Sequence, residues 1–228
     1  MIARHDFENC DELALHLAER VAQILKSSIN LRGKAALAVS GGSTPKLLFQ
    51  HLSKLELDWS KVTVTLVDER LVPADSERSN ERMVRQLLLK NKASAANFIG
   101  LTFENPLGIG TIESRVATIA MPFDAVILGM GNDGHTASYF PGGDLLNQAV
   151  SLLTKDLLCL IDAPGAGEPR ITFTLPSLVG ARNTFLHIEG DKKLQVLENA
   201  LNEGEANDRP IRHILRHKDV VLAIYWSP

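Results

Sequence analysis

Residues 35–39 read AALAV, and the glycine-containing turn SGGSTP follows directly at residues 40–45. An apolar run that ends at such a turn is typical of a strand covered on both faces of a sheet. The next stretch, residues 45–55, carries apolar residues at helical spacing. A buried strand followed at once by an amphipathic helix is the building unit of α/β proteins with a parallel sheet.

The same alternation continues along the chain. We expect further strands in the short apolar runs at residues 62–67, 125–128, 157–161, 184–188 and 220–224. Amphipathic stretches predict helices at residues 11–29, 80–89, 111–120 and 192–201. Less regular segments, which we expect to leave the regular layers, are residues 73–80, 103–110 and 163–170. The pattern predicts an α/β fold with a mostly parallel sheet and helices on both faces.

Length and composition limit the class of protein. The 228 residues are 45% hydrophobic and suit a single domain over residues 1–228, in which residues 1–34 supply a helix that packs on the α/β core. The net charge of −3 argues against non-specific nucleic-acid binding, which needs a clustered basic surface. No apolar run approaches the roughly 20 residues that span a bilayer, and the N-terminus lacks a signal-peptide core. Cys10 and Cys159 are typical of reduced thiols in a cytoplasmic protein.

The SGGSTP turn is a candidate anion site. In an open parallel sheet, ligands bind outside the carboxyl ends of the strands, where loops meet helix N-termini. Glycines let the backbone approach a ligand closely, and the amides and hydroxyls of Gly42, Ser43 and Thr44 suit a phosphate. The alternative is an ordinary strand–turn–helix connection in which Ser43 or Thr44 caps the helix and Pro45 occupies its first turn.

A charged cluster, Asp68-Glu69-Arg70, follows the apolar run at residues 62–67. The planar guanidinium of Arg70 suits bidentate contact with a phosphate. Asp68 is a candidate to orient a neighbouring histidine or to bind a sugar hydroxyl. The alternative is a surface ion-pair cluster. Ser79-Asn80 further along is typical of a helix cap.

Residues 129–138, GMGNDGHTAS, follow the apolar run at residues 125–128. They match G-x-G-x-x-G, but a dinucleotide site also needs a long helix at the last glycine and an acidic residue about 20 positions on, at the end of the next strand. Here residues 139–143 (YFPGG) interrupt the chain, and the nearest acid at a strand end, Asp162, lies 28 residues after Gly134. The glycines instead expose Asp133 and His135. A histidine beside a carboxylate suits general-base chemistry because imidazole titrates near physiological pH. The alternative is a structural histidine in a turn.

Two further cations are candidates for the same anion site. Arg170 is the last residue of the 163–170 segment. Lys193 lies near a predicted helix start, where a cation opposes the helix dipole and therefore calls for another role. The alternative for Lys193 is a solvated side chain. We expect His187, inside an apolar run, to be packed in the core. No triad of histidine, cysteine or carboxylate residues has metal-ligand spacing, so we expect no metal.

Five motifs occur in an order that resembles the 6-phosphogluconolactonase family over residues 35–226. They are GGSTP, DER with VP and SN behind it, GMGNDGHTASYFPG, RIT and GDKK. The resemblance implies a doubly wound α/β domain with a smaller subdomain, no cofactor and a pocket for a phosphorylated sugar. It also implies that His135 is the catalytic base and that Arg70 is a phosphate ligand.

The wider superfamily includes glucosamine-6-phosphate deaminases, which resemble DGHIAFNEP where this chain has DGHTASYFP. Phe140 stands where that pattern has a glutamate, and an apolar ring cannot transfer a proton. Ester hydrolysis needs only a base and a polarised carbonyl, so the local pattern favours a lactonase. The alternatives are an isomerase–deaminase and a non-catalytic sugar-phosphate sensor.

These observations predict hydrolysis of 6-phospho-D-glucono-1,5-lactone to 6-phosphogluconate, in which neutral His135 takes a proton from water. Either Asp133 or Asp68 orients the imidazole, and the backbone amides of residues 129–134 or Asn132 stabilise the oxyanion. Residues expected to hold the phosphate are Gly42, Ser43, Thr44, Arg70, Arg170 and Lys193. We expect the small-molecule lactone to be the partner, with no nucleic acid or membrane, and the chain to be a monomer or a weak homo-oligomer.

Overall fold

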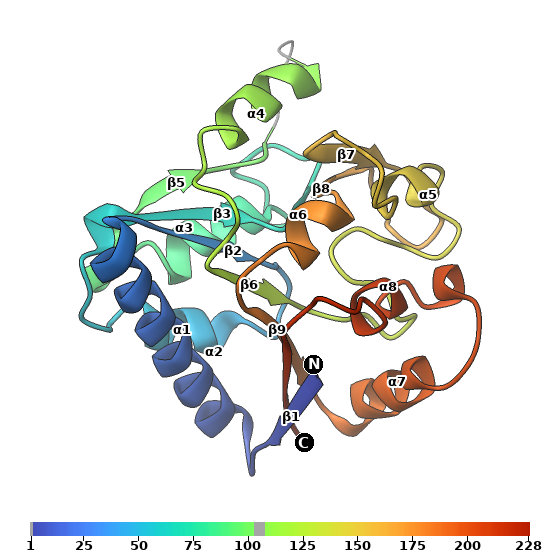
Figure 1. Cartoon of the computed structure of the whole chain (residues 1–228), viewed down its shortest axis with the longest axis horizontal. Coiled ribbons are helices and arrows are strands. Elements are labelled where there is room, and N and C mark those ends of the chain that lie inside the picture. Colours follow the sequence, from blue (N-terminus) through green and yellow to red (C-terminus); the bar gives the residue numbers. More distant parts are fainter. Residues whose placement is uncertain (1, 103–107) are drawn as a thin grey trace.

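The computed structural model describes residues 2–102 and 108–228, and its main element is a seven-stranded parallel sheet (Figure 1). The strand order is β1-β10-β9-β6-β2-β3-β5. The strands are β1 (Ile2–Asp6), β2 (Ala35–Val39), β3 (Val62–Leu66), β5 (Asn97–Ile99), β6 (Ala125–Leu128), β9 (Thr184–Glu189) and β10 (Leu222–Ser227). Neighbouring strands of this sheet pair in parallel, which confirms the predicted α/β class.

Helices flank this sheet in two groups, and within each group every helix contacts the next one (Figure 1). One group comprises α1 (Cys10–Arg32), α2 (Lys46–Leu52) and α3 (Asn80–Leu87), and the other comprises α6 (Leu175–Val179), α8 (Arg212–Leu215) and α7 (Asp191–Leu201). The remaining helical segments are α4 (Gly108–Val116), α5 (Leu146–Ala149), η1 (Trp59–Lys61), η2 (Asn91–Ala95) and η3 (Ala206–Asp208). Among the residues that the structure describes, no helix is long and apolar enough to cross a membrane.

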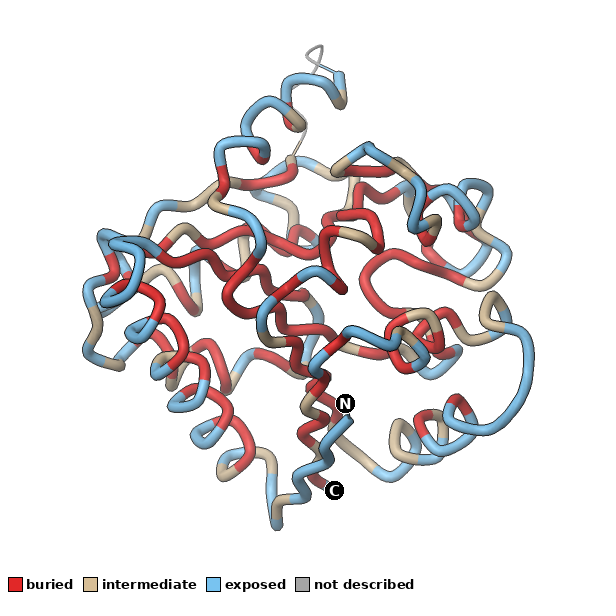
Figure 2. The backbone as a smooth tube through the Cα atoms, in the orientation of Figure 1, coloured by how far each residue is buried: buried red, intermediate tan, exposed pale blue. Residues whose placement is uncertain are grey.

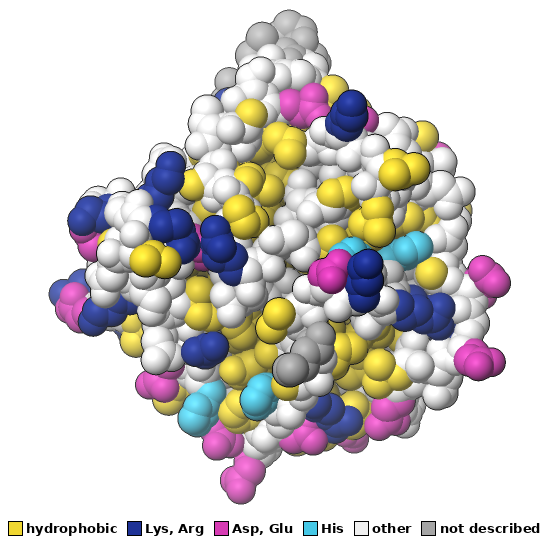
Figure 3. Space-filling model, in the orientation of Figure 1, with side chains coloured by type: hydrophobic (Ala, Val, Ile, Leu, Met, Phe, Trp, Pro, Cys, Tyr) yellow, Lys and Arg dark blue, Asp and Glu magenta, His cyan; other side chains and the backbone are white. Residues whose placement is uncertain are grey.

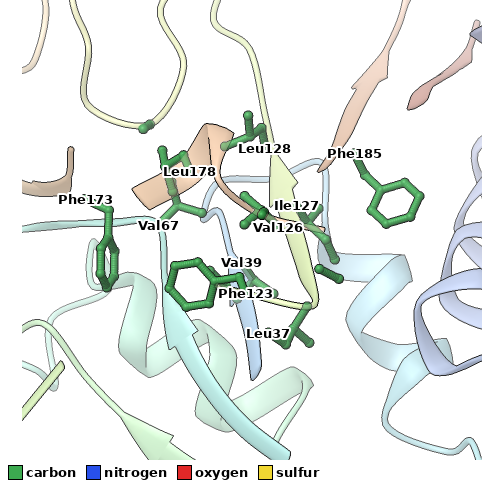
Figure 4. Packing of buried hydrophobic residues seen from close by; sticks show 14 of the residues in the cluster. Leu37, Val39, Val67, Phe123, Val126, Ile127, Leu128, Phe173, Leu178 and Phe185 are labelled. Atoms are coloured by element: carbon green, nitrogen blue, oxygen red, sulfur yellow. The ribbon is translucent and has the colours of Figure 1, made fainter. Parts of the chain in front are cut away.

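The central strands form the middle of the hydrophobic core (Figure 2). Every residue of β2 and of β6 is buried, which is why both strands appear in the sequence as uninterrupted apolar runs. Figure 4 shows Leu37, Val39 and Ile127 packed with aromatic side chains in this core. The rings of Phe123 and Phe173 meet edge to face, with centroids 5.3 Å apart. Because each such side chain contributes about 1.5–3 kcal/mol when buried, this core holds the strand ends in fixed positions.

A second, smaller sheet is antiparallel and has the order β4-β8-β7. It consists of β4 (Asp68–Arg70), β8 (Arg170–Phe173) and β7 (Leu158–Ile161). The strand predicted at residues 157–161 is confirmed as β7, but it pairs antiparallel with β8 and lies outside the main parallel sheet. This sheet forms the smaller subdomain that the family resemblance implies. Its register places Arg70 directly opposite Arg170.

The N-terminal segment differs from the single helix expected for residues 1–34. Residues 2–6 form β1, an exposed edge strand that pairs with β10 before the helix begins. Helix α1 then starts after Asn9, whose side chain accepts a hydrogen bond from the Glu12 amide, and ends at Gly33 in the left-handed conformation (φ 74°). Its apolar stripe is buried against the sheet, as predicted. Of the expected irregular segment at residues 103–110, residues 103–107 lie outside the described part, and α4 begins at Gly108.

Candidate active site

A pocket of about 350 Å³ lies where the ends of β2, β6 and β9 meet the small sheet. Nine of the ten predicted site residues line it: Gly42, Ser43, Thr44, Asp68, Arg70, Asn132, His135, Arg170 and Lys193. The tenth, Asp133, contacts His135 from outside the lining. On the molecular face seen in Figure 3, basic and acidic side chains are interspersed around hydrophobic stretches. The chain as a whole has a net charge of −3, so the cations that line the pocket are a local concentration of positive charge.

The turn after β2 forms one wall of the pocket. Gly42 has a φ of 93°, and Gly41 lies so close to Asn80 that a β-carbon would collide with its side chain. The alternative in which Ser43 or Thr44 caps the next helix does not hold, because Pro45 is the N-cap of α2 and no side chain caps it. The Thr44 hydroxyl instead accepts a hydrogen bond from Lys193 Nζ at 3.1 Å. The turn and the start of α7 are thereby joined at the pocket.

Lys193 and His187 reach the pocket from the last part of the chain. Burial lowers the pKa of Lys193, and the nearby Glu189 carboxylate opposes this effect. His187 is packed in the core, as predicted, and its Nε2 lies 3.1 Å from Glu189 Oε1. It nevertheless lines the pocket as well, which its place in an apolar run did not indicate. The predicted alternative of a solvated Lys193 does not hold, because its ammonium group contacts Thr44.

Arg70 and Arg170 lie side by side on neighbouring strands of the small sheet. The Arg70 Nη1 group donates to the Arg78 carbonyl and, at 3.1 Å, to Asn80 Oδ1, and its Nε lies 3.7 Å from a Glu168 oxygen. Arg170 Nη2 donates to the Ala166 carbonyl at 2.7 Å. Burial lowers the pKa of Arg170, although the Asp68 carboxylate opposes this effect. Two adjacent guanidinium groups in a pocket wall suit a ligand with more than one negative charge.

Glu69 fixes the strand that carries Arg70. Its buried carboxylate accepts hydrogen bonds from the amides of Arg70, Asn80 and Glu81 and from the Ser79 hydroxyl. Burial raises the pKa of Glu69, and these hydrogen bonds oppose the increase. Ser79 is the N-cap of α3, as predicted. The DER segment is therefore not a solvated ion-pair cluster, because two of its three side chains are buried.

His135 and Asp133 form a close pair in the loop after β6. Asp133 Oδ1 lies 2.6 Å from His135 Nδ1 and also accepts from the His135 amide at 3.1 Å. Burial raises the pKa of Asp133, but the hydrogen bond and the charge of His135 outweigh it, so the net pKa is lowered. An ionised Asp133 accepts the Nδ1 proton of neutral imidazole, which leaves Nε2 as the proton acceptor.

Asp68, the other carboxylate considered for this orienting role, has different partners. Its side chain is buried and accepts a hydrogen bond from Ser138 Oγ at 2.5 Å. Asp68 Oδ2 also lies 3.9 Å from Arg170 Nη1. Within residues 2–102 and 108–228, Asp133 is the carboxylate that forms a hydrogen bond with the imidazole, so Asp68 belongs to the arginine side of the pocket.

The candidate oxyanion donors are fewer than the sequence suggested. The Gly129 amide donates to Ser40 Oγ, the Gly131 amide to the His135 carbonyl, and the Gly134 amide to the Gly131 carbonyl. These three amides are engaged in holding the loop together, so the expectation is wrong for them. Asn132 remains a candidate, because its side chain lines the pocket and has no hydrogen-bond partner among residues 2–102 and 108–228.

Sequence reasoning did not predict three contacts that shape the site. Ser40 supports the catalytic-loop amide of Gly129, and Asn80 Nδ2 donates to the Asp68 carbonyl at 2.9 Å. Phe140 stacks on the His135 ring, with centroids 4.1 Å apart. Ser40 follows a buried strand directly, which was the available signal. Asn80 lies 12 residues after Asp68, and Phe140 lies in the same loop as His135, but no periodic pattern in the sequence indicates either contact.

The chain belongs to the family described as glucosamine-6-phosphate isomerases/6-phosphogluconolactonase, whose pattern matches residues 8–224. It is 50% identical over 227 residues to a 6-phosphogluconolactonase from Rhizobium meliloti (strain 1021), with 98% of each chain covered. It is 36% identical over 231 residues to the 6-phosphogluconolactonase of Neisseria meningitidis (serogroup B, strain MC58), with 100% of each chain covered.

Solved structures agree with this placement. A 6-phosphogluconolactonase from Shewanella baltica OS155 has a TM-score of 0.96 and 39% identity, and the match covers 100% of this chain and 98% of that chain. A monomeric glucosamine-6-phosphate deaminase has a TM-score of 0.77 but only 17% identity, so that likeness shows the shared fold alone.

Proposed function

We propose that this protein hydrolyses 6-phospho-D-glucono-1,5-lactone to 6-phospho-D-gluconate, the lactone-opening step of the oxidative pentose phosphate pathway. The observation that carries the proposal is the meeting of two features in one pocket. His135, paired with Asp133, lines the same cavity as Arg70 and Ser43. The full-length similarity to proteins named 6-phosphogluconolactonase supports this substrate rather than another phosphorylated sugar.

The phosphate binds at the end of the pocket that carries the positive charge. Arg70 and Arg170 supply adjacent guanidinium groups, and Lys193 supplies an ammonium group beside Thr44. Ser43 and the amides of residues 42–44 add uncharged donors. Binding the phosphate fixes the distant lactone carbonyl against His135, which removes much of the entropic cost of bringing the reacting groups together.

His135 acts as the general base on water. Its Nε2 takes a proton as the water oxygen attacks the lactone carbonyl carbon, and Asp133 stabilises the imidazolium ion that forms. The carbonyl oxygen becomes an oxyanion, for which the Asn132 side chain is the leading donor. When the intermediate collapses, the bond from the carbonyl carbon to the ring oxygen breaks, and the imidazolium returns the proton to that oxygen. General-base assistance of this kind contributes about 10²–10⁴-fold.

An isomerase–deaminase would need a proton-transferring glutamate at position 140, and this chain has none there. Phe140 occupies the position at which the deaminase pattern has a glutamate, and its buried ring lies against His135. Lactone hydrolysis requires one base, a water molecule and an oxyanion donor, so the same proposal includes no cofactor. The two cysteines are free thiols, which fits our placement of the activity in the cytoplasm.

A coupled assay tests the proposal directly. Acid release from freshly prepared 6-phosphogluconolactone is followed with the spontaneous hydrolysis subtracted, and the protein is expected to accelerate it well above that rate. His135→Ala should keep the fold, as judged by circular dichroism, and lose most of the acceleration. The absence of acceleration by the native protein, or ammonia release from glucosamine 6-phosphate, would refute the proposed function.

A further inference from the structure

Phe140 brings three parts of the pocket together. Its ring centroid lies 4.1 Å from that of His135, and the two rings are inclined by 27°. The guanidinium carbon of Arg170 lies 5.3 Å from the same Phe140 centroid. Phe140 is itself buried in a small apolar cluster with Ala163 and Ala166, which come from the segment before β8. The ring therefore contacts the proposed base, a proposed phosphate ligand and a neighbouring loop.

A tight, well-anchored turn carries Phe140 back to His135. Ala137 adopts a φ of 49°, in the left-handed region that side-chain-bearing residues rarely occupy. Thr136 and Tyr139 form a β-bridge across this turn, and the Tyr139 hydroxyl donates to the Phe173 carbonyl at 2.7 Å. The turn is thus fixed to the small sheet, and the ring that follows it has a defined place.

The hydrogen bond that Asp133 accepts from His135 Nδ1 does not by itself fix the plane of the imidazole. A single contact at Nδ1 sets the position of one ring atom but leaves the ring able to tilt about that contact. A flat aromatic face at stacking distance removes this freedom, because tilting the imidazole would bring it into collision with the stacked ring. A base works only when it is held within about 10–20° of the productive orientation.

We propose that Phe140 is a positioning residue for His135, which sets the plane of the imidazole and holds it in a fixed relation to Arg170. The inference rests on the proposed function, because it assigns a role within the same site. Phe140 is not among the residues that line the pocket, so it acts through His135 and Arg170, which do line it. Its contact with the Arg170 guanidinium joins the base to the positively charged end of the pocket.

Phe140→Leu tests the proposal, since leucine keeps an apolar side chain but lacks a flat face. We expect kcat for 6-phosphogluconolactone to fall about 10-fold, with KM changed about twofold or less. Phe140→Tyr keeps the ring and should restore most of kcat. The matched control is Phe123→Leu, which removes a buried ring that packs on Phe173 in the main core. It should lower the melting temperature and leave kcat within about twofold.

A second background separates positioning from general packing. In His135→Ala there is no imidazole to align, so adding Phe140→Leu should not lower the residual kcat further. A further drop of about 10-fold in that background would overturn the proposal, because Phe140 would then act independently of His135. A drop in kcat for Phe123→Leu equal to that for Phe140→Leu would overturn it as well, because any loss of core packing would then suffice.

An NMR measurement tests the stacking without using activity. A ring 4.1 Å away shields the His135 ring protons, so their resonances should lie upfield in the native protein and in Phe140→Tyr. They should move downfield in Phe140→Leu, and unchanged resonances in that variant would overturn the proposal. A native protein that fails to hydrolyse the lactone but shows these shifts would refute the proposed function and leave the ring contact intact.

Discussion

Replacing Arg70 with alanine should weaken recognition of the phosphate group far more than it affects the chemistry. Arg70 lines the pocket beside Arg170, whereas the proposed base and its carboxylate lie in the separate loop after β6. A hydrogen bond to a charged group contributes about 1.5–3 kcal/mol, and about 1.4 kcal/mol corresponds to tenfold. Since Arg170 and Lys193 remain, we expect the lower part of this range, a rise in KM of about 10- to 30-fold.

The assay compares 6-phosphogluconolactone with unphosphorylated glucono-1,5-lactone. For the unphosphorylated lactone, Arg70→Ala should leave kcat/KM within about twofold, because that substrate presents nothing for the guanidinium to bind. Arg78→Ala is the matched control. Arg78 is largely exposed and pairs with Glu168 at 2.8 Å, but it does not line the pocket. Arg78→Ala should change kcat/KM for either lactone by no more than about twofold.

An equal loss of kcat/KM on both lactones would refute this reasoning. It would mean that Arg70 supports the pocket as a whole, through its contacts with the Arg78 carbonyl and Asn80, and does not distinguish the phosphate. Thermal unfolding of the variant distinguishes the two cases, since loss of that support should also lower the melting temperature.

Four further predictions concern three individual groups, Asp133, Cys159 and Glu168. Asp133→Asn should lower kcat about 10²-fold by removing the carboxylate that orients and stabilises the imidazole, measured in the coupled assay at pH 7. The fold lowers the pKa of Asp133, so this carboxylate stabilises the protein fully above its ordinary pKa of 3.8. That stabilisation is lost as pH falls through the lowered pKa. The melting temperatures of the native protein and Asp133→Asn should therefore converge in strong acid. Burial raises the pKa of Cys159 to about 11, so at pH 8 only about one Cys159 thiol in 10³ is ionised. A thiol reagent should therefore modify the partly exposed Cys10 first and modify Cys159 only after unfolding. Glu168→Gln should tighten binding of inorganic phosphate in a calorimetric titration, because it removes a negative charge 3.7 Å from Arg70; weaker binding would contradict the role given to Arg70.

The predicted and observed elements agree best where burial is complete. The runs at residues 35–39 and 125–128 match β2 and β6 residue for residue, because strands buried on both faces have no polar interruption. The exposed strand β1 has the polar sequence IARHD and was missed. Its strand conformation comes from pairing with β10, more than 200 residues away in the chain, which local periodicity cannot detect.

The site shows the same division between local and distant contacts. Asp133 and His135 are two residues apart, so their hydrogen bond follows from the loop sequence itself. Lys193 and Thr44 are 149 residues apart, and only the parallel order of the strands brings them together. The short strand β4 has three polar residues and was interpreted as a ligand-binding loop, because its pairing with β8 leaves no periodic signal in the sequence.

The counter-ions of the arginine pair explain how this pocket is stable before substrate arrives. Two guanidinium groups opposite one another repel, and burial makes that repulsion stronger than it would be in water. Asp68 lies near Arg170 and Glu168 lies near Arg70, so each cation has a carboxylate within 4 Å. Because neither carboxylate is at close hydrogen-bond distance from its arginine, both guanidinium groups retain donors for an incoming anion. We therefore expect the same carboxylates that permit the pair to form to limit how tightly the two arginines bind an anion.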